Sequence, residues 1–345
     1  MKPISIVVLA QMLQILGVSA LAADNTNGAF IRKLNPAQVS QHLRQNCGRS
    51  GASVSLEQDA NVSQAPKWDQ LKDPNKQYLC LTGLNGDSLR TLPGAYCGSD
   101  FPGETVNWKN PIRIFGLNLP SQGGLSVESN GAYLFQGLEK AANDPQAKPI
   151  CFVAHSKGAA DLLEMVRLVE LEPNRAKQEK LRAKIGCLDM IQPAIWGSPL
   201  SDGALSPPVL GPNSMSTRVR EDYNRRHMAT ICRGLSRMPN VKPSVYASYT
   251  TNLSAIEGLF QGGTHAGQEI TQFTKAQCKF NDGFVSVDQT LVPCPSVKHY
   301  VHVVQNSDQG AGHLIQGEPF SRAARFLASK SNPPGNRIRS QADRN

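Results

Sequence analysis

The chain has 345 residues and a formal net charge of +9, from 36 Lys and Arg against 27 Asp and Glu. Hydrophobic residues make up 40% of the sequence and charged residues 18%, which excludes an intrinsically disordered chain. The positive charge favours anionic surfaces or substrates. Because the cations are scattered and aromatic residues are only 6%, we expect no nucleic-acid partner. Nothing in the sequence predicts an oligomeric state.

The N-terminus has the pattern of an export signal. Lys2 precedes an apolar run that continues to Leu16, and Ala20 and Ala22 supply a small-residue cleavage site. Such a segment is too short for a membrane span. We therefore predict a signal peptide over residues 1–22 and a secreted or periplasmic mature protein. A buried N-terminal helix is the alternative.

All eight cysteines follow this segment, and an even number in an oxidising compartment favours disulfides. We predict one pair only, Cys278 with Cys294, which would close a loop around a candidate catalytic carboxylate. Cys80 and Cys151 lie in apolar runs and are equally compatible with buried free thiols. The sequence has no C-x-x-C motif, so a zinc site or a thioredoxin-like site has no support.

Short apolar runs alternate with amphipathic stretches, after one helix candidate at 36–45. Strands are expected at 78–81, 112–117, 149–154, 188–196, 244–249 and 300–304, and helices at 130–143, 161–170, 174–183, 216–238 and 319–329. This alternation predicts an α/β protein with a mostly parallel central sheet and helices on both faces. The tail over 331–345 is expected to be disordered.

The segment 200–242 interrupts the alternation. Its first part is rich in Pro and Gly, and its second part is basic with apolar residues at helical spacing. It precedes the strand that leads to the candidate acid, so we interpret it as an inserted cap or lid over the site. A lid with a basic outer face would suit work at an anionic membrane surface. A helix packed permanently on the core is an equal alternative.

Ser156 is the candidate nucleophile. It lies in Ala154-His155-Ser156-Lys157-Gly158, which joins an expected strand directly to a helix. On such a sharp turn the serine Oγ stands clear of the sheet, and small residues two positions away on each side relieve crowding. The N–H groups of the first helical turn favour developing negative charge. The alternative is a serine that only caps the helix.

The acid and the base of a triad should follow in that order. Asp282 lies in a turn after the strand at 244–249, and His313 lies in a polar loop after the strand at 300–304. Both therefore fall at carboxyl ends of strands, where open parallel sheets hold their sites. The alternatives left open are Asp288 and Asp308 for the acid, and His299 and His302 for the base.

An oxyanion hole needs two backbone donors. The first is the N–H of Lys157, the residue after the nucleophile, and the second should come from the loop after the strand at 78–81. That loop is Thr82-Gly83-Leu84-Asn85-Gly86, and we predict the N–H of Leu84 as the second donor. An ordinary glycine-rich turn is nearly as good an interpretation of these five residues.

These motifs resemble those of the α/β-hydrolases, and in particular those of the secreted bacterial lipases and esterases. T-G-L-N-G is similar to their oxyanion loop with Thr82 in place of His, and A-H-S-K-G is similar to their elbow with Ala154 at the first position. Three further blocks resemble the region after their sixth strand, their acid segment and their His loop: residues 196–202, 281–287 and 312–316. The resemblance covers residues 76–320 and implies an α/β-hydrolase domain over 23–330.

The resemblance implies a carboxylic-ester hydrolase that acts on an acyl ester or a lipid through an acyl-enzyme intermediate. It implies no organic cofactor, and the sequence shows no carboxylate cluster from which to predict a metal. The same triad would serve a polyester depolymerase or an acyltransferase. An exported binding protein on a hydrolase scaffold is the alternative from another class.

Overall fold

The computed structural model describes residues 36–47, 53–57, 62–83, 96–106, 112–114, 117–119, 126–198, 201, 215–239, 241–250, 278, 280, 282, 285–304 and 318–331. The expected signal peptide and the residues after 331 lie outside these ranges. Among the described helices, none has the length and apolar character needed to cross a membrane.

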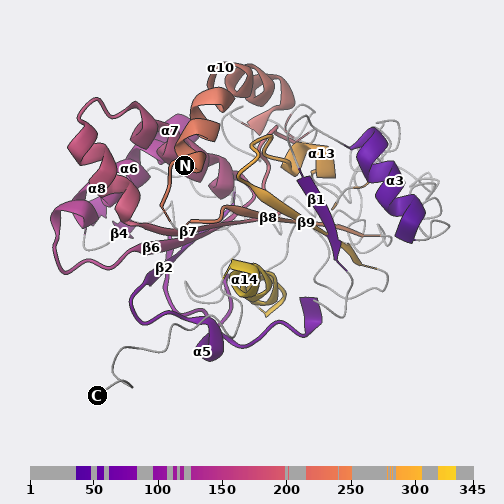
Figure 1. Cartoon of the computed structure of the whole chain (residues 1–345), viewed down its shortest axis with the longest axis horizontal. Coiled ribbons are helices and arrows are strands. Elements are labelled where there is room, and N and C mark those ends of the chain that lie inside the picture. Colours follow the sequence, from indigo (N-terminus) through magenta and orange to yellow (C-terminus); the bar gives the residue numbers. More distant parts are fainter. Residues whose placement is uncertain are drawn as a thin grey trace, which may run out of the picture.

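A seven-stranded parallel sheet forms the centre of the molecule (Figure 1). Its strands are β1 (Ser53–Glu57), β2 (Gln77–Leu81), β3 (Glu104–Val106), β6 (Ile150–His155), β7 (Ile185–Ile191), β8 (Ser244–Thr250) and β9 (Lys298–Val304). They lie in the order β1-β9-β8-β7-β6-β2-β3, and every neighbouring pair is parallel. Each residue of β6 is buried, as expected for a strand covered on both faces.

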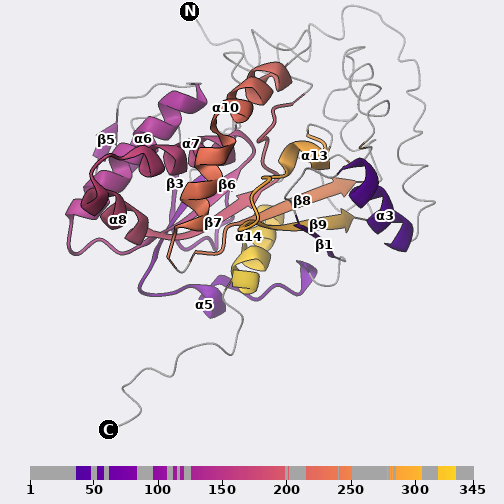
Figure 2. The same ribbon diagram turned by 45° about the horizontal axis from the view of Figure 1, so that its top comes forward.

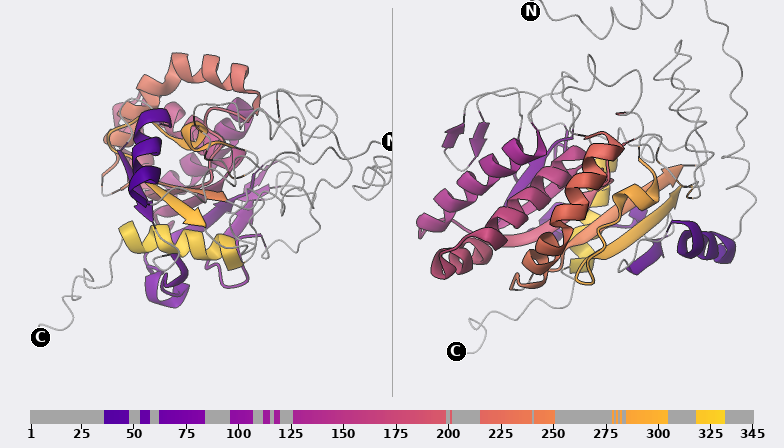
Figure 3. Two further views of the ribbon diagram at one scale, coloured as in Figure 1. Left: turned by 90° about the vertical axis from the view of Figure 1, so that its right-hand side faces the viewer. Right: turned by 90° about the horizontal axis from the view of Figure 1, so that it is seen from above.

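Helices cover both faces of this sheet. The helices α6 (Val127–Asn143), α7 (Lys157–Leu171), α8 (Arg175–Ala183) and α10 (Thr217–Ser236) lie on one face, and α5 (Trp68–Leu71) and α14 (Glu318–Ser331) lie on the other (Figures 1 and 2). Viewed from the side, α10 and α14 are on opposite sides of the strands (Figure 3). The helix α3 (Pro36–Asn46) and the single turn α13 (Val287–Thr290) lie toward the β1 and β9 edge.

Alternate residues of the central strands supply two separate cores. Phe152 and Ala154 of β6 pack with the apolar faces of α6, α7 and α10. Cys151 and Val153, which point the other way, pack with α14. Because successive side chains of a strand face opposite sides, burial on both faces requires the continuous apolar runs that the sequence shows.

Side chains cap the starts of α6, α8 and α10. Ser126 accepts a hydrogen bond from the Ser129 N–H at α6, Asn174 accepts one from Lys177 at α8, and Ser216 accepts one from Val219 at α10. Ser and Asn are preferred at this position because they satisfy a backbone donor that the helix itself leaves unpaired.

The expected α/β-hydrolase architecture is confirmed, with differences at the sheet edges. The run 112–117 is not a core strand. It contributes to a separate antiparallel pair, β4 (Ile112–Ile114) with β5 (Leu117–Leu119). The strands β1 and β3 had not been predicted. Both lie at edges of the sheet, and their sequences, SVSLE and ETV, lack a long apolar run.

The predicted disulfide Cys278–Cys294 is wrong. The four disulfides are Cys47–Cys278, Cys80–Cys97, Cys151–Cys187 and Cys232–Cys294. Cys278 packs in the apolar cluster that contains Val39 and Leu43 of α3, whereas Cys294 belongs to the cluster beneath α10. Each therefore meets a partner from a different, distant part of the chain. Cys80 and Cys151 are disulfide-bonded rather than free.

Candidate active site

Ser156 lies at the junction of β6 and α7 with a left-handed backbone. Its φ is 52° and its ψ is −122°, a conformation that costs a residue with a side chain about 1–3 kcal/mol. Two hydrogen bonds to the end of β7 and the turn after it hold this backbone. The Ser156 N–H donates to the Ile191 carbonyl, and the Ser156 carbonyl accepts from the Ala194 N–H, both at 3.2 Å. Unlike Ser126, it makes no side-chain cap at its helix among the described residues. The turn therefore has the strained geometry of a strand-to-helix elbow.

The residues around Ser156 allow a very close approach of two backbones. A Cβ on Gly158 would lie 2.7 Å from the Thr82 carbonyl oxygen and 2.9 Å from that of Leu81, which is closer than real Cβ contacts. The first turn of α7 therefore rests directly on the end of β2, and only glycine fits there. On the other side of the serine, Ala154 is fully buried and lies opposite Leu81 in the sheet register.

The start of the predicted oxyanion loop contacts the serine. A Cβ on Gly83 would lie 2.8 Å from the Ser156 Cβ and 3.4 Å from its Oγ. Thr82, just before it, donates from its hydroxyl to the Val106 carbonyl at 3.2 Å. Leu84 lies outside the described residues. Lys157, the other predicted donor, is the first residue of α7.

Ser156 and Gly83 lie where the order of the strands reverses. From β2 the chain adds β3 on one side, and then crosses to place β6 on the other side of β2. In an open parallel sheet this reversal leaves a crevice beyond the carboxyl ends of the two strands, which is where such folds bind their ligands. Ser156 follows β6 and Gly83 follows β2, so both residues stand at this crevice.

Asp282 lies in a tight turn on the face of the sheet that α7 covers. Its side chain is 1% exposed, and its Oδ1 accepts from the Val285 N–H at 2.8 Å while its own N–H donates to the Val285 carbonyl at 3.1 Å. Val285 belongs to a small apolar cluster with Ala160, which is in the first turns of α7. The chain thus brings the Asp282 turn against the helix that begins at Ser156. His313 lies outside the described residues.

The alternative acids and bases have other partners. Asp288 accepts from the Ser286 hydroxyl at 2.5 Å at the start of α13, and Asp308 lies outside the described residues. His299 accepts from the Val292 N–H at 3.0 Å. His302 shares a 2.5 Å hydrogen bond with the Tyr246 hydroxyl. Both histidines are buried within β9, so their described contacts are structural.

A buried ion pair lies next to the elbow, and sequence reasoning had missed it. The Lys157 ammonium binds the Asp161 carboxylate at 2.7 Å, and the Asn130 amide of α6 donates to the same carboxylate at 2.9 Å. Burial lowers the pKa of Lys157 and raises the pKa of Asp161, and their mutual attraction opposes both shifts. The i,i+4 spacing of Lys157 and Asp161 was a readable signal, but nothing local pointed to Asn130.

The described half of the expected cap is α10, which is firmly attached to the core. Asn224 donates to the Ile195 carbonyl at 2.8 Å, and the Tyr223 hydroxyl hydrogen-bonds Glu164 of α7. The buried Arg220 also donates to the Ile195 carbonyl, at 3.3 Å. Farther along, the Cys232–Cys294 disulfide ties α10 to the segment before β9. Residues 202–214 lie outside the described part.

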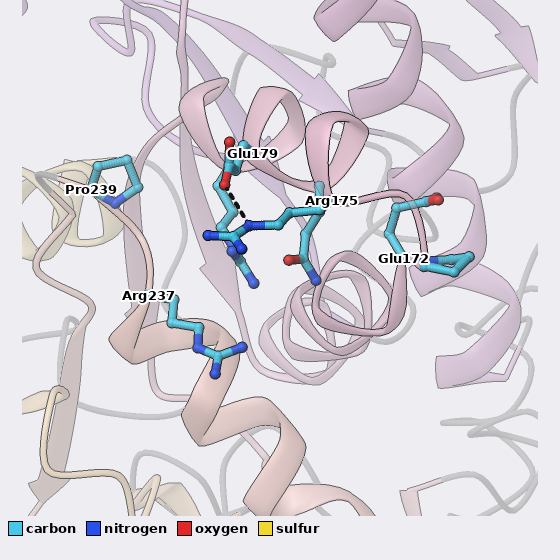
Figure 4. Close-up of a pocket in the computed structure, with 8 residues that line it drawn as sticks. Glu172, Arg175, Glu179, Arg237 and Pro239 are labelled. Carbon is cyan, nitrogen blue, oxygen red and sulfur yellow. Dashed lines mark hydrogen bonds and ion pairs between the residues drawn. The ribbon is translucent and has the colours of Figure 1, made fainter.

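A cavity of about 680 Å³ lies at the opposite end of α7 (Figure 4). Its lining consists of Glu172, Pro173, Arg175, Gln178, Glu179, Arg182, Arg237 and Pro239. The 15 residues of α7 place it about 22 Å from the elbow. Its arginines are already paired, for example Arg175 with Glu179 at 3.1 Å and Arg237 with Glu170 at 2.7 Å. It is therefore separate from the candidate active site.

Comparison with known proteins found no family model that matches this chain, and no curated relative. Among solved structures, a metagenomic carboxyl esterase has a TM-score of 0.44 at 16% identity, with 75% of this chain and 76% of that chain covered. The mature lipase of Bacillus licheniformis has a TM-score of 0.44 at 16% identity, with 75% and 92% covered. A phospholipase from Legionella pneumophila has a TM-score of 0.38 at 14% identity, with 63% and 46% covered.

The geometry of this chain itself identifies its fold. Its sheet is parallel, a strand-to-helix turn holds Ser156 in a left-handed conformation, and the glycine of the preceding loop contacts that serine. A serine on a sharp strand-to-helix turn at the end of a central parallel strand is the nucleophile-elbow geometry of the α/β-hydrolase fold. The chain has an α/β-hydrolase fold.

Proposed function

We propose that this protein is a carboxylic-ester hydrolase of the lipase and esterase type, with Ser156 as nucleophile. The observation that carries the proposal is the strained Ser156 backbone, packed against Gly83 at the crevice between β2 and β6. Backbone strain persists only where the surroundings enforce it, and it concentrates at functional sites. A serine needed only to begin a helix would adopt the relaxed cap geometry of Ser126.

In the proposed reaction, Ser156 Oγ attacks the ester carbonyl carbon as His313 takes its proton. The N–H groups of Leu84 and Lys157 hold the oxyanion, and His313 returns the proton to the leaving alkoxide. Water then attacks the acyl-enzyme carbonyl carbon as His313 takes a proton from it, and His313 returns that proton to Ser156 Oγ as the acid product leaves. Asp282 orients His313. The turn held by the Val285 N–H keeps the Asp282 carboxylate in place. No step requires a cofactor.

We further propose that the enzyme is exported and acts on an acyl ester or a lipid. Four disulfides support an oxidising compartment, because such bonds persist where thiols are not kept reduced. In this scheme α10 forms a fixed wall of the site rather than a moving lid. The buried Asn224 and Tyr223 contacts and the Cys232–Cys294 disulfide support that choice.

A fluorophosphonate probe tests the proposal, because it reacts only with an activated serine. We expect the probe to label the wild-type protein at Ser156, and we expect Ser156→Ala to abolish both labelling and p-nitrophenyl ester hydrolysis without loss of folded structure. Ser126→Ala is the matched control, since it removes an ordinary helix-capping serine. An unlabelled wild-type protein would instead favour a binding protein on a hydrolase scaffold. For a labelled protein, product analysis with water, alcohol and polyester substrates separates hydrolase, acyltransferase and depolymerase.

A further inference from the structure

His155, the residue before the candidate nucleophile, is buried against two aromatic rings. Its side chain is 3% exposed, and its ring centroid is 5.7 Å from that of Tyr96 and 5.8 Å from that of Phe320 of α14. The Tyr96 hydroxyl also hydrogen-bonds His155 Nδ1. We assign the tyrosine as the donor, which leaves the proton of the neutral imidazole on Nε2.

The same edge of the imidazole faces the start of the oxyanion loop. The position of a Cβ on Gly83 lies 3.1 Å from His155 Nδ1, as well as 2.8 Å from the Ser156 Cβ. Gly83 is therefore in contact with two consecutive residues of the elbow. A change in the orientation of the His155 ring would alter the surface against which Gly83 rests.

Tyr96 is itself fixed by a covalent link to the strand that precedes Gly83. The next residue, Cys97, forms a disulfide with Cys80 of β2, and both half-cystines are fully buried. The contacts therefore close into a ring that runs from β2 through the disulfide to Tyr96, on to His155 and Ser156, and back to β2 through Gly83. In this ring the Tyr96–His155 link is a hydrogen bond, the Gly83–Ser156 link is a packing contact with the serine side chain, and the other links are covalent.

We propose that Tyr96 is a positioning residue for ester hydrolysis, acting through His155 to hold Gly83 against Ser156. This inference rests on the proposed function. The described hydrogen bond of the Tyr96 hydroxyl is to His155 and not to the nucleophile, so we expect its effect in the rate of acylation rather than in ester binding. Misplacement of catalytic donors by a fraction of an ångström lowers rates without unfolding a protein.

A second pair of the same chemistry in this protein provides a matched control. The Tyr246 hydroxyl hydrogen-bonds His302 Nδ1 at 2.5 Å, with ring centroids 5.8 Å apart. Phe326 of α14 lies 6.1 Å from the Tyr246 ring. This pair joins β8 to β9 and has no described contact with Ser156 or Gly83. Tyr246→Phe therefore removes the same kind of bond from the same apolar cluster, at a strand that lies two places from β6 in the sheet.

The experiment compares Tyr96→Phe with Tyr246→Phe in the full chain with its disulfides intact. For Tyr96→Phe we expect kcat on a short p-nitrophenyl ester to fall about tenfold or more, with KM within about twofold, and the fluorophosphonate labelling rate to fall by the same factor. For Tyr246→Phe we expect kcat within about twofold of wild type, even where its loss of thermal stability is comparable.

Two substitutions of His155 give a second, independent readout. His155→Asn keeps an acceptor oxygen near the position of Nδ1, whereas His155→Leu does not. We expect the Asn variant to retain more kcat than the Leu variant. Adding Tyr96→Phe should cost further activity in the Asn background and none in the Leu background, because coupled residues are not additive. If Tyr96→Phe does not fold, the comparison of His155→Asn with His155→Leu tests the inference instead.

Three results would overturn the inference: unchanged kcat in Tyr96→Phe, an equal loss of kcat in Tyr246→Phe, or equal activity of the two His155 variants. These failures differ from failure of the proposed function. If the wild-type protein neither hydrolyses esters nor reacts with the probe, the hydrolase proposal and this inference fall together. If the wild-type protein does both and Tyr96→Phe equals it, only the inference falls.

Discussion

Asp189 makes the stability of this protein depend on pH. The carboxyl group lies in the middle of β7, is 1% exposed, and accepts from the Ser244 hydroxyl at 2.5 Å. Burial raises its pKa from 3.8 to about 7, against the smaller opposing effects of Ser244 and Lys76. The folded protein therefore holds a proton on Asp189 at pH values where the unfolded chain has already released it.

The sign and the size of the effect follow from this difference. Between pH 4 and pH 7 the folded state binds more protons than the unfolded state, so the free energy of unfolding falls as pH rises. A pKa raised from 3.8 to about 7 corresponds to as much as about 4 kcal/mol, at about 1.4 kcal/mol for each pH unit. The stabilising contribution is complete below pH 3.8 and is lost once the pH passes 7. Asp189→Asn mimics the protonated carboxyl and should remove the dependence.

Urea unfolding followed by tryptophan fluorescence at pH 4.5, 6 and 8 measures this effect. We expect the wild-type protein to lose stability relative to Asp189→Asn across this range, so that the variant is the more stable protein at pH 8. Asp222→Asn is the control, because Asp222 is exposed and forms a surface pair with Arg226, which contributes little. The reasoning is refuted if the difference between wild type and Asp189→Asn stays constant with pH or changes in the opposite direction.

Two further predictions concern the candidate triad. Ser156→Gly should be more stable to urea than Ser156→Ala by about 1 kcal/mol, because glycine tolerates the left-handed backbone that alanine keeps under strain; equal stability of the two variants would contradict the strain argument. Asp282→Asn should retain the hydrogen bond from the Val285 N–H and the fold, yet lower kcat by several orders of magnitude, as for triad acids elsewhere. If Asp288→Asn lowers kcat more than Asp282→Asn does, the acid has been assigned to the wrong carboxylate.

The central strands could be predicted from the sequence because burial on both faces gives an unambiguous apolar run. The run in β6 is buried at every residue, and the strands at 77–81, 244–250 and 298–304 were also placed within two residues, whereas the strand predicted at 188–196 lies at 185–191. The edge strand β1 could not be found in this way. Its burial ranges from exposed to buried over residues 54–57, and its pairing with β9 depends on a segment more than 240 residues away.

The same distinction between local patterns and long-range contacts applies to the candidate site. The strand-to-helix turn at Ser156 could be predicted because strand, small residues and helix follow one another locally, whereas the roles of Ser156 and of the loop after Gly83 stay predictions. The Tyr96–His155 hydrogen bond and the Asn130–Asp161 contact join residues with no periodic or motif-like relation. The disulfide pairing could not be predicted for the same reason. Cys47 and Cys278 are 231 residues apart, and only the assembled sheet brings them together.

The pairing of β1 with β9 places the first strand of the sheet beside the last one. A chain made from its N-terminus therefore presents β1 long before β9 exists, and loop closure over such a span is slow. Until β9 pairs with β1, Cys47 is not held beside Cys278 and remains available to the other six cysteines. We expect the edge formed by α3, β1 and β9 to assemble last, and Cys47 to be the thiol from which mispaired species arise during oxidative refolding.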